Sequence, residues 1–527
     1  MESHSRTEDG AGPEVTPVSK REPTSIGRNL VALAGGQLVT WTMTLGWTLV
    51  VPRLLGPAEI GLIITAWSVT GMLAILLGFG TRNYLVRAIV VDRDGAPALV
   101  GTGTVLRLLL SPLFLAVVVF WAHFAHYGHE GNLVLYLAAG ATVLTLLAEP
   151  MQAAFQALER MKYLAYSDVI NKSAQGLLGI VLAVAGAGAV GFAGCWMVMS
   201  GVVLVLDALW LRPHVRLKLR TDARRLICMA KESVAYWAFG MFFMIYLWID
   251  TAMLSLMTNP TVVGWYGVPT KLFQTMMFLP VMLSTAWLPR LVNVFEQSPK
   301  NLQRAARAPI ELAFMLGIPI AAGMCIVAGP MIHLVYGRAY DQAVPVMMIL
   351  GLCIPPMYLN IMLSQVLIAA KRQVRWTWVM AGATVVNPAI NAVLIPLAQA
   401  RFHNGAIGAA VALLLTELLI VTVGFAMVGR GVIDRRSARR VARTAMACAA
   451  TCGISFLLRP YGTVASLVAA ALVFVMLAWA LRLVTPAEAE LIRERLARIG
   501  PRLPAGLGRS RVYGWMCAGS SGEERAA

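Results

Sequence analysis

VPRLLGPAEIGLIITAWSV, residues 51–69, interrupts the first long apolar segment of the chain. The stretch places the charge of Arg53 and the turn-forming pair Gly56–Pro57 between two apolar runs. Each run is close to the roughly 20 residues that a helix needs to cross the hydrocarbon core of a bilayer. The sequence therefore predicts a short turn at one membrane surface between two transmembrane helices.

The composition of the whole chain agrees with this interpretation. Its 527 residues are 58% hydrophobic and only 13% charged, whereas a soluble protein carries about 25% charged residues. The apolar runs are continuous rather than alternating, which favours helices over a β-barrel. We therefore expect an all-α polytopic membrane protein.

About fourteen apolar segments have a length close to that of a transmembrane helix. They lie at 29–52, 57–80, 100–122, 132–157, 164–186, 189–211, 233–257, 261–288, 309–335, 343–369, 376–398, 405–428, 441–458 and 463–483.

The basic residues predict the orientation of these segments. They recur in every second loop, beginning with Arg82, Arg87, Arg93 and Arg107, whereas the alternate loops contain only Arg53, Arg338, Arg401 and Arg459. Because cytoplasmic loops carry the excess of Lys and Arg, both termini are expected in the cytoplasm, with an even number of spans. The net charge of +18 is thus spread over loops, and no basic domain remains that would bind nucleic acid.

The opening stretch has a second copy 203 residues later. A proline followed four residues on by glycine occurs at 57–61 and 260–264, and an aromatic-Leu-x-Arg sequence occurs at 84–87 and 287–290. Spans 1–6 and 7–12 also have the same predicted orientation. We therefore expect two parallel six-helix bundles plus two C-terminal helices, a plan typical of transporters whose halves rock around a central cavity.

The domain organisation follows from this repeat. We expect a disordered cytoplasmic tail at 1–25, which has no signal-peptide core, an N-terminal six-helix lobe at 26–211, a basic cytoplasmic linker at 212–231, a C-terminal six-helix lobe at 232–428, transmembrane helices 13 and 14 at 429–484, and a cytoplasmic amphipathic helix and tail at 485–527.

Three motifs near the start of the chain resemble a known family. They are R-x-L-G-P-x-x-x-G from Arg53 to Gly61, the pair Phe79-Gly80, and L-V-R at 85–87. With the fourteen-span plan, they resemble the multidrug/oligosaccharidyl-lipid/polysaccharide (MOP) flippase superfamily, in particular its polysaccharide exporter (Wzx-type) branch. This resemblance implies an undecaprenyl-diphosphate-linked oligosaccharide as cargo, moved from the inner to the outer leaflet of the bacterial inner membrane. Membrane lipids and polysaccharide polymerase or chain-length machinery are its expected partners.

Two other functions are weighed against this one. A transporter of the same fold could carry a drug, a cation or lipid II. A membrane polymerase or ligase would act through sizeable extracytoplasmic loops, but the longest such loop, 123–132, is short. The sequence also has no P-loop and no nucleophile elbow, so we expect no enzyme activity and no cofactor.

Four basic residues are candidates for holding the anionic headgroup. Lys271 lies well inside a span, where its ammonium could hold a diphosphate or could reach an interface along its long stem. Arg82, Arg87 and Arg290 lie at predicted cytoplasmic helix ends, where they could receive the diphosphate or act only as orientation signals.

Four further charges are candidates for gating or ion coupling. Arg53 and Asp250 lie at the outer ends of spans that are repeat mates, so they could pair as an outer gate or remain two separate interface charges. Asp250 could also bind a coupling proton or Na⁺. Glu149 and Glu417 lie near the middle of spans, where each is a candidate proton site or a neutral structural carboxyl group.

No metal site is expected from the histidines. His123, His126 and His129 are spaced by three in one loop, but the loop offers no obvious Cys or Asp partner.

Overall fold

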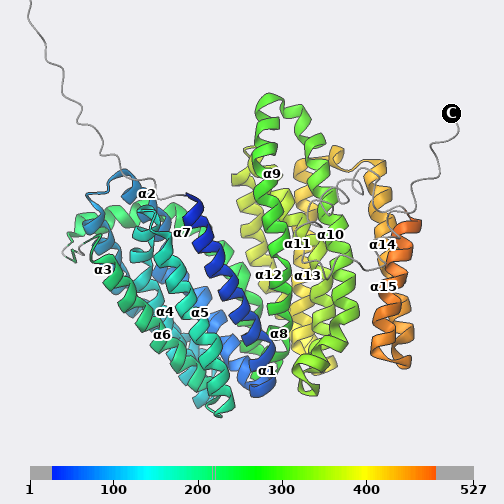
Figure 1. The fold of residues 1–527 in the computed structure, drawn as a ribbon, viewed down its shortest axis with the longest axis horizontal. Coiled ribbons are helices and arrows are strands. Elements are labelled where there is room, and N and C mark those ends of the chain that lie inside the picture. The colour runs from blue at the N-terminus through cyan, green and yellow to red at the C-terminus, as the bar shows by residue number, and fades with distance from the viewer. Residues whose placement is uncertain (1–25, 216–217, 220, 482–527) are drawn as a thin grey trace, which may run out of the picture. The chain divides into compact units, whose positions relative to one another are not determined.

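The computed structural model describes residues 26–215, 218–219 and 221–481, and their regular secondary structure is helical throughout (Figure 1). The predictions for the tail 1–25, for 485–527 and for positions 216, 217 and 220 of the basic linker lie outside the described residues.

The long helices follow the order of the predicted spans. Their bounds are α1 (Ile26–Gly78), α2 (Thr81–Val91), α3 (Ala96–Ala125), α4 (His129–Ala157), α5 (Met161–Val184), α6 (Gly188–Leu211), α7 (Ala223–Met257), α8 (Pro260–Met276), α9 (Phe278–Gln297), α10 (Leu302–Met331), α11 (Ala343–Ala369), α12 (Gln373–Phe402), α13 (Gly405–Val428), α14 (Arg435–Leu458) and α15 (Thr463–Ala480). Short turns η1 (Pro299–Asn301), η2 (Ile332–Tyr336), η3 (Arg338–Tyr340), η4 (Arg430–Val432) and η5 (Arg459–Tyr461) connect some of them.

Eleven helical segments of the described residues are long and apolar enough to cross a membrane. The expectation of an all-helical, multi-pass membrane protein is therefore confirmed. One of these segments, Val39–Gly78, covers most of two predicted spans, and α15 contributes a shorter apolar helix at Ala465–Ala480. The total of fourteen spans stays a prediction.

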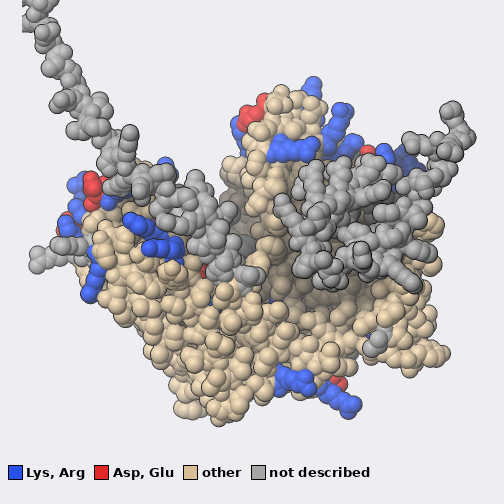
Figure 2. Space-filling view, in the orientation of Figure 1, with Lys and Arg blue, Asp and Glu red and all other residues tan. Residues whose placement is uncertain are grey.

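The chain forms two compact units. The described part of unit 1 consists of residues 26–51, 73–215, 218–219 and 221–240, and that of unit 2 consists of residues 52–72 and 241–481. In unit 1, α4 packs against α2, α3, α5 and α6; in unit 2, α11 packs against α8, α9, α10 and α13. In each unit of Figure 2 the charged side chains gather near the helix ends, and the sides of the bundle are mostly uncharged.

The opening stretch lies where α1 is broken. Gly56 has φ 80° and ψ 172°, which is not helical, and helix continues on both sides of it. An added Cβ would meet no atom there, so the position requires glycine for its backbone conformation rather than for space.

The two copies of the repeated turn pack directly on one another within unit 2. An added Cβ on Gly61 would lie 1.7 Å from the carbonyl oxygen of Pro260, and one on Gly264 would lie 2.0 Å from the carbonyl oxygen of Pro57. The contact is reciprocal, because each glycine faces the proline of the other copy. The segment 52–72, although early in the chain, is thereby held against the start of α8.

Candidate functional site

The most highly charged contact in unit 1 joins α2, α3 and α4. Arg107 of α3 is completely buried, and its Nη2 lies 2.5 Å from Oε2 of Glu149 on α4. The other carboxylate oxygen of Glu149 lies 3.6 Å from Nη1 of Arg82 on α2. The structure thus brings together two predicted site residues, Arg82 and Glu149, around an arginine that the sequence had assigned to a loop.

Neutral groups complete the surroundings of Arg107. Its Nη1 donates to the carbonyl oxygen of Leu146 at 2.5 Å, and its Nη2 also donates to Oγ1 of Thr81 at 2.9 Å. Its Nε is buried and has no hydrogen-bond partner among the described residues. Because a buried charge is tolerated only when it is paired, Glu149 is the group that makes this position of Arg107 possible.

Local backbone structure places Arg82 at this contact. Phe79 and Gly80 have left-handed φ values of 45° and 66°, which end α1 and start α2 in a new direction. The hydroxyl of Thr81 donates to the carbonyl oxygen of Gly78 at 2.8 Å and fixes the first turn of α2. Apolar packing on the remaining faces of α2, α3 and α4 holds the three helices together; its buried members include Leu85, Ile89, Val100, Met151 and Phe155.

Asp207 is a buried carboxylate in unit 1 that the sequence analysis missed. It lies on α6 and is completely buried, with hydrogen bonds from Oγ of Ser167 at 2.5 Å and from Nε2 of Gln152 at 2.9 Å. The available signal was an acidic residue inside the apolar run 189–211. Its partners are neutral, unlike those of Glu149.

Unit 2 places Asp250 in a network of buried amides. Asp250 of α7 is 6% exposed and accepts a hydrogen bond from Nδ2 of Asn391 on α12 at 2.6 Å. The same Nδ2 donates to Oδ1 of Asn387 at 2.9 Å, and the amide of Asn387 reaches Oγ1 of Thr416 at 3.4 Å. The amide oxygen of Asn391 is buried without a hydrogen-bond donor in the described part of the chain.

Glu417 also lies in the interior of unit 2. It is completely buried on α13, where one oxygen accepts a hydrogen bond from the hydroxyl of Tyr246 and the other from Nδ2 of Asn360 at 3.0 Å. No described cation lies within ion-pair distance of Glu417 or of Asp250. The described partners of these two carboxylates are therefore neutral, and they come from α7, α8, α11 and α12.

Lys271 lies between two tryptophans of unit 2. Its Nζ is 4.8 Å from the centre of the Trp67 ring and 5.9 Å from that of the Trp248 ring, at distances typical of cation–π contacts. Its ammonium forms no ion pair with the described carboxylates. An unpaired ammonium beside aromatic rings can accept an anionic or sugar-bearing ligand.

The structure gives Arg53 a partner other than Asp250. Nη1 of Arg53 donates to the carbonyl oxygen of Leu334 at 3.0 Å, and no ion pair between Arg53 and Asp250 is found in the described residues. The buried Tyr340 donates to the carbonyl oxygen of Pro52 at 3.0 Å. The expected Arg53–Asp250 pair is therefore not formed; instead, the start of segment 52–72 is fastened to η2 and η3.

Arg87 and Arg290 are both exposed. Arg290 of α9 lies over the ring of Trp287 at 5.1 Å, whereas Arg87 of α2 forms no ion pair with a described carboxylate. Neither residue joins the clusters above, and each remains an exposed cation.

The three histidines around the turn between α3 and α4 do not gather with other metal-binding groups in the described residues. His123 and His126 lie with ring centres 6.2 Å apart, and the described residues contain no cluster of three His, Cys, Asp or Glu side chains suited to a metal.

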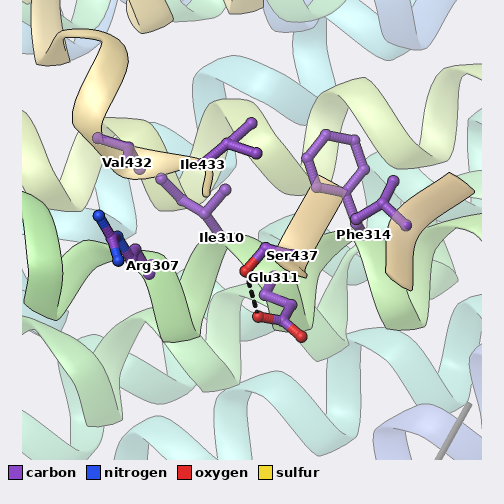
Figure 3. A pocket seen from close by; sticks show the side chains of 8 residues that line it. Arg307, Ile310, Glu311, Phe314, Val432, Ile433 and Ser437 are labelled. Atoms are coloured by element: carbon purple, nitrogen blue, oxygen red, sulfur yellow. Dashed lines mark hydrogen bonds between the residues drawn. The ribbon is translucent and has the colours of Figure 1, made fainter. Parts of the chain in front are cut away.

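A further charged contact fastens α14 to α10 in unit 2 (Figure 3). Nη1 of Arg440 lies 2.8 Å from Oε1 of Glu311. Oε2 of Glu311 accepts a hydrogen bond from the hydroxyl of Ser437 at 2.8 Å, which Figure 3 shows as a dashed line. Arg307 lies 3.2 Å from Asp434, the residue that caps α14. The backbone N–H of Ser437, followed by its hydroxyl and the nearby Arg307, holds the pKa of Asp434 below its usual range. This contact serves to dock the C-terminal helices.

The chain matches a known protein family over much of its length. Residues 50–345, more than half of it, match the family model described as polysaccharide biosynthesis protein. The chain belongs to the polysaccharide biosynthesis protein family. No curated protein sequence matches it significantly.

Solved structures with the same fold are transporters of the MOP superfamily. The lipid II flippase MurJ in an inward closed conformation matches with a TM-score of 0.67 at 11% identity, over 86% of this chain and 98% of that one. An inward-facing multidrug resistance MATE transporter of the MOP superfamily matches with a TM-score of 0.61 at 14% identity, over 79% and 98%. The helical membrane-protein fold class that the sequence indicated is therefore confirmed. At these identities the likeness concerns the fold alone.

Proposed function

We propose that this protein flips an undecaprenyl-diphosphate-linked oligosaccharide from the inner to the outer leaflet of the bacterial plasma membrane. The observation that carries the proposal is the match to a polysaccharide biosynthesis family in a chain with the MurJ-like flippase fold. We expect both termini in the cytoplasm, as the distribution of basic residues predicts, and no enzyme activity.

The physical need for such a protein is clear. A sugar-diphosphate headgroup cannot cross hydrocarbon unaided, because buried charges and unpaired polar groups each cost several kcal/mol. The cations Lys271, Arg82, Arg87 and Arg290 are the groups proposed to hold the diphosphate. Outward movement of an anion is favoured by about 2.3 kcal/mol per charge for every 100 mV of inside-negative potential.

Unit 2 supplies the groups proposed for ion coupling. Asp250 and Glu417 are buried with neutral partners, so a proton or Na⁺ could neutralise either of them. Near Asp250 the amide oxygen of Asn391 has no hydrogen-bond donor in the described structure, and oxygen ligands suit a hard cation. Glu149 is less suited to this role because Arg107 already compensates its charge.

The test is to delete the gene and locate the lipid-linked oligosaccharide. We expect the intermediate to accumulate on the inner leaflet and outer-surface polysaccharide to fall. Unchanged delivery to the outer leaflet, in a strain without a redundant flippase, would contradict the proposal.

Lipid II is the second candidate cargo, because MurJ has the highest TM-score among the structures compared above. The two cargoes are separated by complementation. Rescue of a strain depleted of its lipid II flippase would favour lipid II, whereas rescue of only the polysaccharide defect would favour the oligosaccharide.

A further inference from the structure

Two guanidinium groups share a single carboxylate at the junction of α2, α3 and α4. Arg82 and Arg107 both contact Glu149, so the cluster carries one uncompensated positive charge. This end of unit 1 is the end that the basic-loop pattern predicts to be cytoplasmic.

Glu149 divides its interaction unequally between the two arginines. Its Oε2 lies 2.5 Å from Nη2 of Arg107, the length of a strong charge-assisted hydrogen bond, whereas its Oε1 lies 3.6 Å from Nη1 of Arg82, which is too long for a hydrogen bond. Arg107 is fully buried, whereas the side chain of Arg82 is 44% exposed. Within the described residues, Arg82 forms no other ion pair or side-chain hydrogen bond.

Arg107 cannot exchange its partner easily. Besides Glu149 it donates to the carbonyl oxygen of Leu146 and to Thr81, and solvent does not reach it. Arg82, in contrast, keeps almost all of its donors for another acceptor. A phosphate oxygen pair matches the planar fork of a guanidinium better than a carboxylate at 3.6 Å does.

We propose that Glu149 is an internal counter-ion and that Arg82 is an acceptor for a phosphate or diphosphate group, which displaces the carboxylate from Arg82 but not from Arg107. The inference deepens the proposed function, on which the choice of a lipid diphosphate as ligand rests. In the resting state Glu149 moderates the attraction of Arg82 for anions. Once the anion is bound, Glu149 contacts Arg107 alone. The anion is then connected, through Arg82 and α2, to the contacts among Thr81, Arg107 and Glu149.

The test measures binding of farnesyl diphosphate to the full-length protein by titration calorimetry, with farnesol as the blank for the apolar tail. Arg82→Ala is expected to weaken binding by at least about tenfold, because a charged hydrogen-bond partner is lost. Glu149→Gln is expected to tighten binding about threefold, because the weak competing charge is removed. Lys172→Ala, which removes an exposed cation of α5 in the same unit, is the charge-matched control and leaves the dissociation constant unchanged.

A second variant guards against loss of folding in Glu149→Gln. The double variant Arg107→Met with Glu149→Gln replaces the buried ion pair by neutral groups of similar size, which is often tolerated. It also frees Arg82 and is expected to show the same tighter binding. Adding Arg82→Ala to either variant abolishes the gain.

The two sources of the anion are separated by inorganic pyrophosphate. If farnesyl diphosphate, corrected for the farnesol blank, binds more tightly than pyrophosphate, the site is assigned to a lipid headgroup. If the two probes bind equally and the variants rank in the same order of affinity for each, the site is assigned to free phosphate.

Two outcomes would overturn the counter-ion role. One is a wild-type protein that binds neither probe, and the other is a folded variant lacking Glu149 whose affinity equals that of the wild type. Flipping activity measured on the same variants keeps this result apart from the proposed function. If the variants show the expected order of affinities but the protein flips no oligosaccharide, only the proposed function is contradicted. If the protein flips the oligosaccharide but the variants all bind with the wild-type affinity, only the counter-ion role of Glu149 is contradicted.

Discussion

Glu149 of unit 1 and the buried carboxylates Asp250 and Glu417 of unit 2 have opposite surroundings. Glu149 of unit 1 lies between two arginines, whereas the described partners of Asp250 and Glu417 in unit 2 are amides and phenols. Both units are built around a central helix, α4 or α11, that contains proline. Around these central helices, unit 1 thus holds a charge-paired carboxylate and unit 2 holds carboxylates with neutral partners.

The largest expected difference between these clusters is in stability. Glu149→Gln leaves the buried Arg107 without its counter-ion and is expected to lower the free energy of unfolding by about 3 kcal/mol. Asp250→Asn keeps the shape of the side chain and leaves no buried cation without a partner, so we expect the free energy of unfolding to change by about 1 kcal/mol or less. Denaturant unfolding of the purified variants in one detergent gives both values. Equal losses of stability would show that Glu149 and Asp250 do not differ in their contribution to folding.

The reciprocal contact of the repeated turns offers a test of equivalence within unit 2. Gly61→Ala and Gly264→Ala each place a Cβ within 2.0 Å of a backbone carbonyl oxygen, and each is expected to cost about 2 kcal/mol through backbone displacement. Gly382→Ala in α12, where an added Cβ meets no atom, is the matched control and should be neutral or slightly stabilising. Thermal denaturation midpoints are compared for the three variants. If only one of the two turn variants is as stable as the wild type, the two copies of the turn are not equivalent.

The opposite chemistries predict opposite functional defects. In vesicles with an imposed proton or Na⁺ gradient, Asp250→Asn and Glu417→Gln are each expected to lower the stimulation of transport by the gradient by up to about tenfold, because each variant loses a carboxylate proposed to bind the ion. Arg82→Ala should lower the apparent affinity for cargo and keep the stimulation. A gradient response that survives in both carboxylate variants would remove unit 2 from the coupling mechanism.

The smallest effect is expected for the pair that the sequence had suggested. Because Arg53 contacts the carbonyl oxygen of Leu334 and not Asp250, a double-mutant cycle with Arg53→Ala and Asp250→Asn should give a coupling energy within about 0.5 kcal/mol of zero. The cycle is measured on unfolding free energies and on transport. Coupling above about 1 kcal/mol, or rescue by exchanging the two charges, would restore the gate hypothesis.

Sequence patterns identified the spans and the repeat but could not assign partners to single charges. Arg107 was counted with the basic residues of a loop, although it is buried in α3. Asp207 was overlooked inside its apolar run, and Arg53 was matched with Asp250 through repeat symmetry. Each of these points depends on which neighbouring helix faces a given side chain, and that information is not contained in hydropathy.

Hydropathy by itself determined a helical, multi-pass membrane protein, and the spacing of basic residues and the repeated proline–glycine turn predicted two related halves. They suffice because the bilayer requires long apolar helices with internally satisfied backbone groups. Only the tertiary structure decided that the second half of α1, residues 52–72, packs with unit 2, and that Glu149 neutralises Arg107 while Asp250 and Glu417 have neutral partners. The physical reason is that a buried charge is stabilised by atoms a few ångströms away, and helix packing brings those atoms from distant parts of the chain.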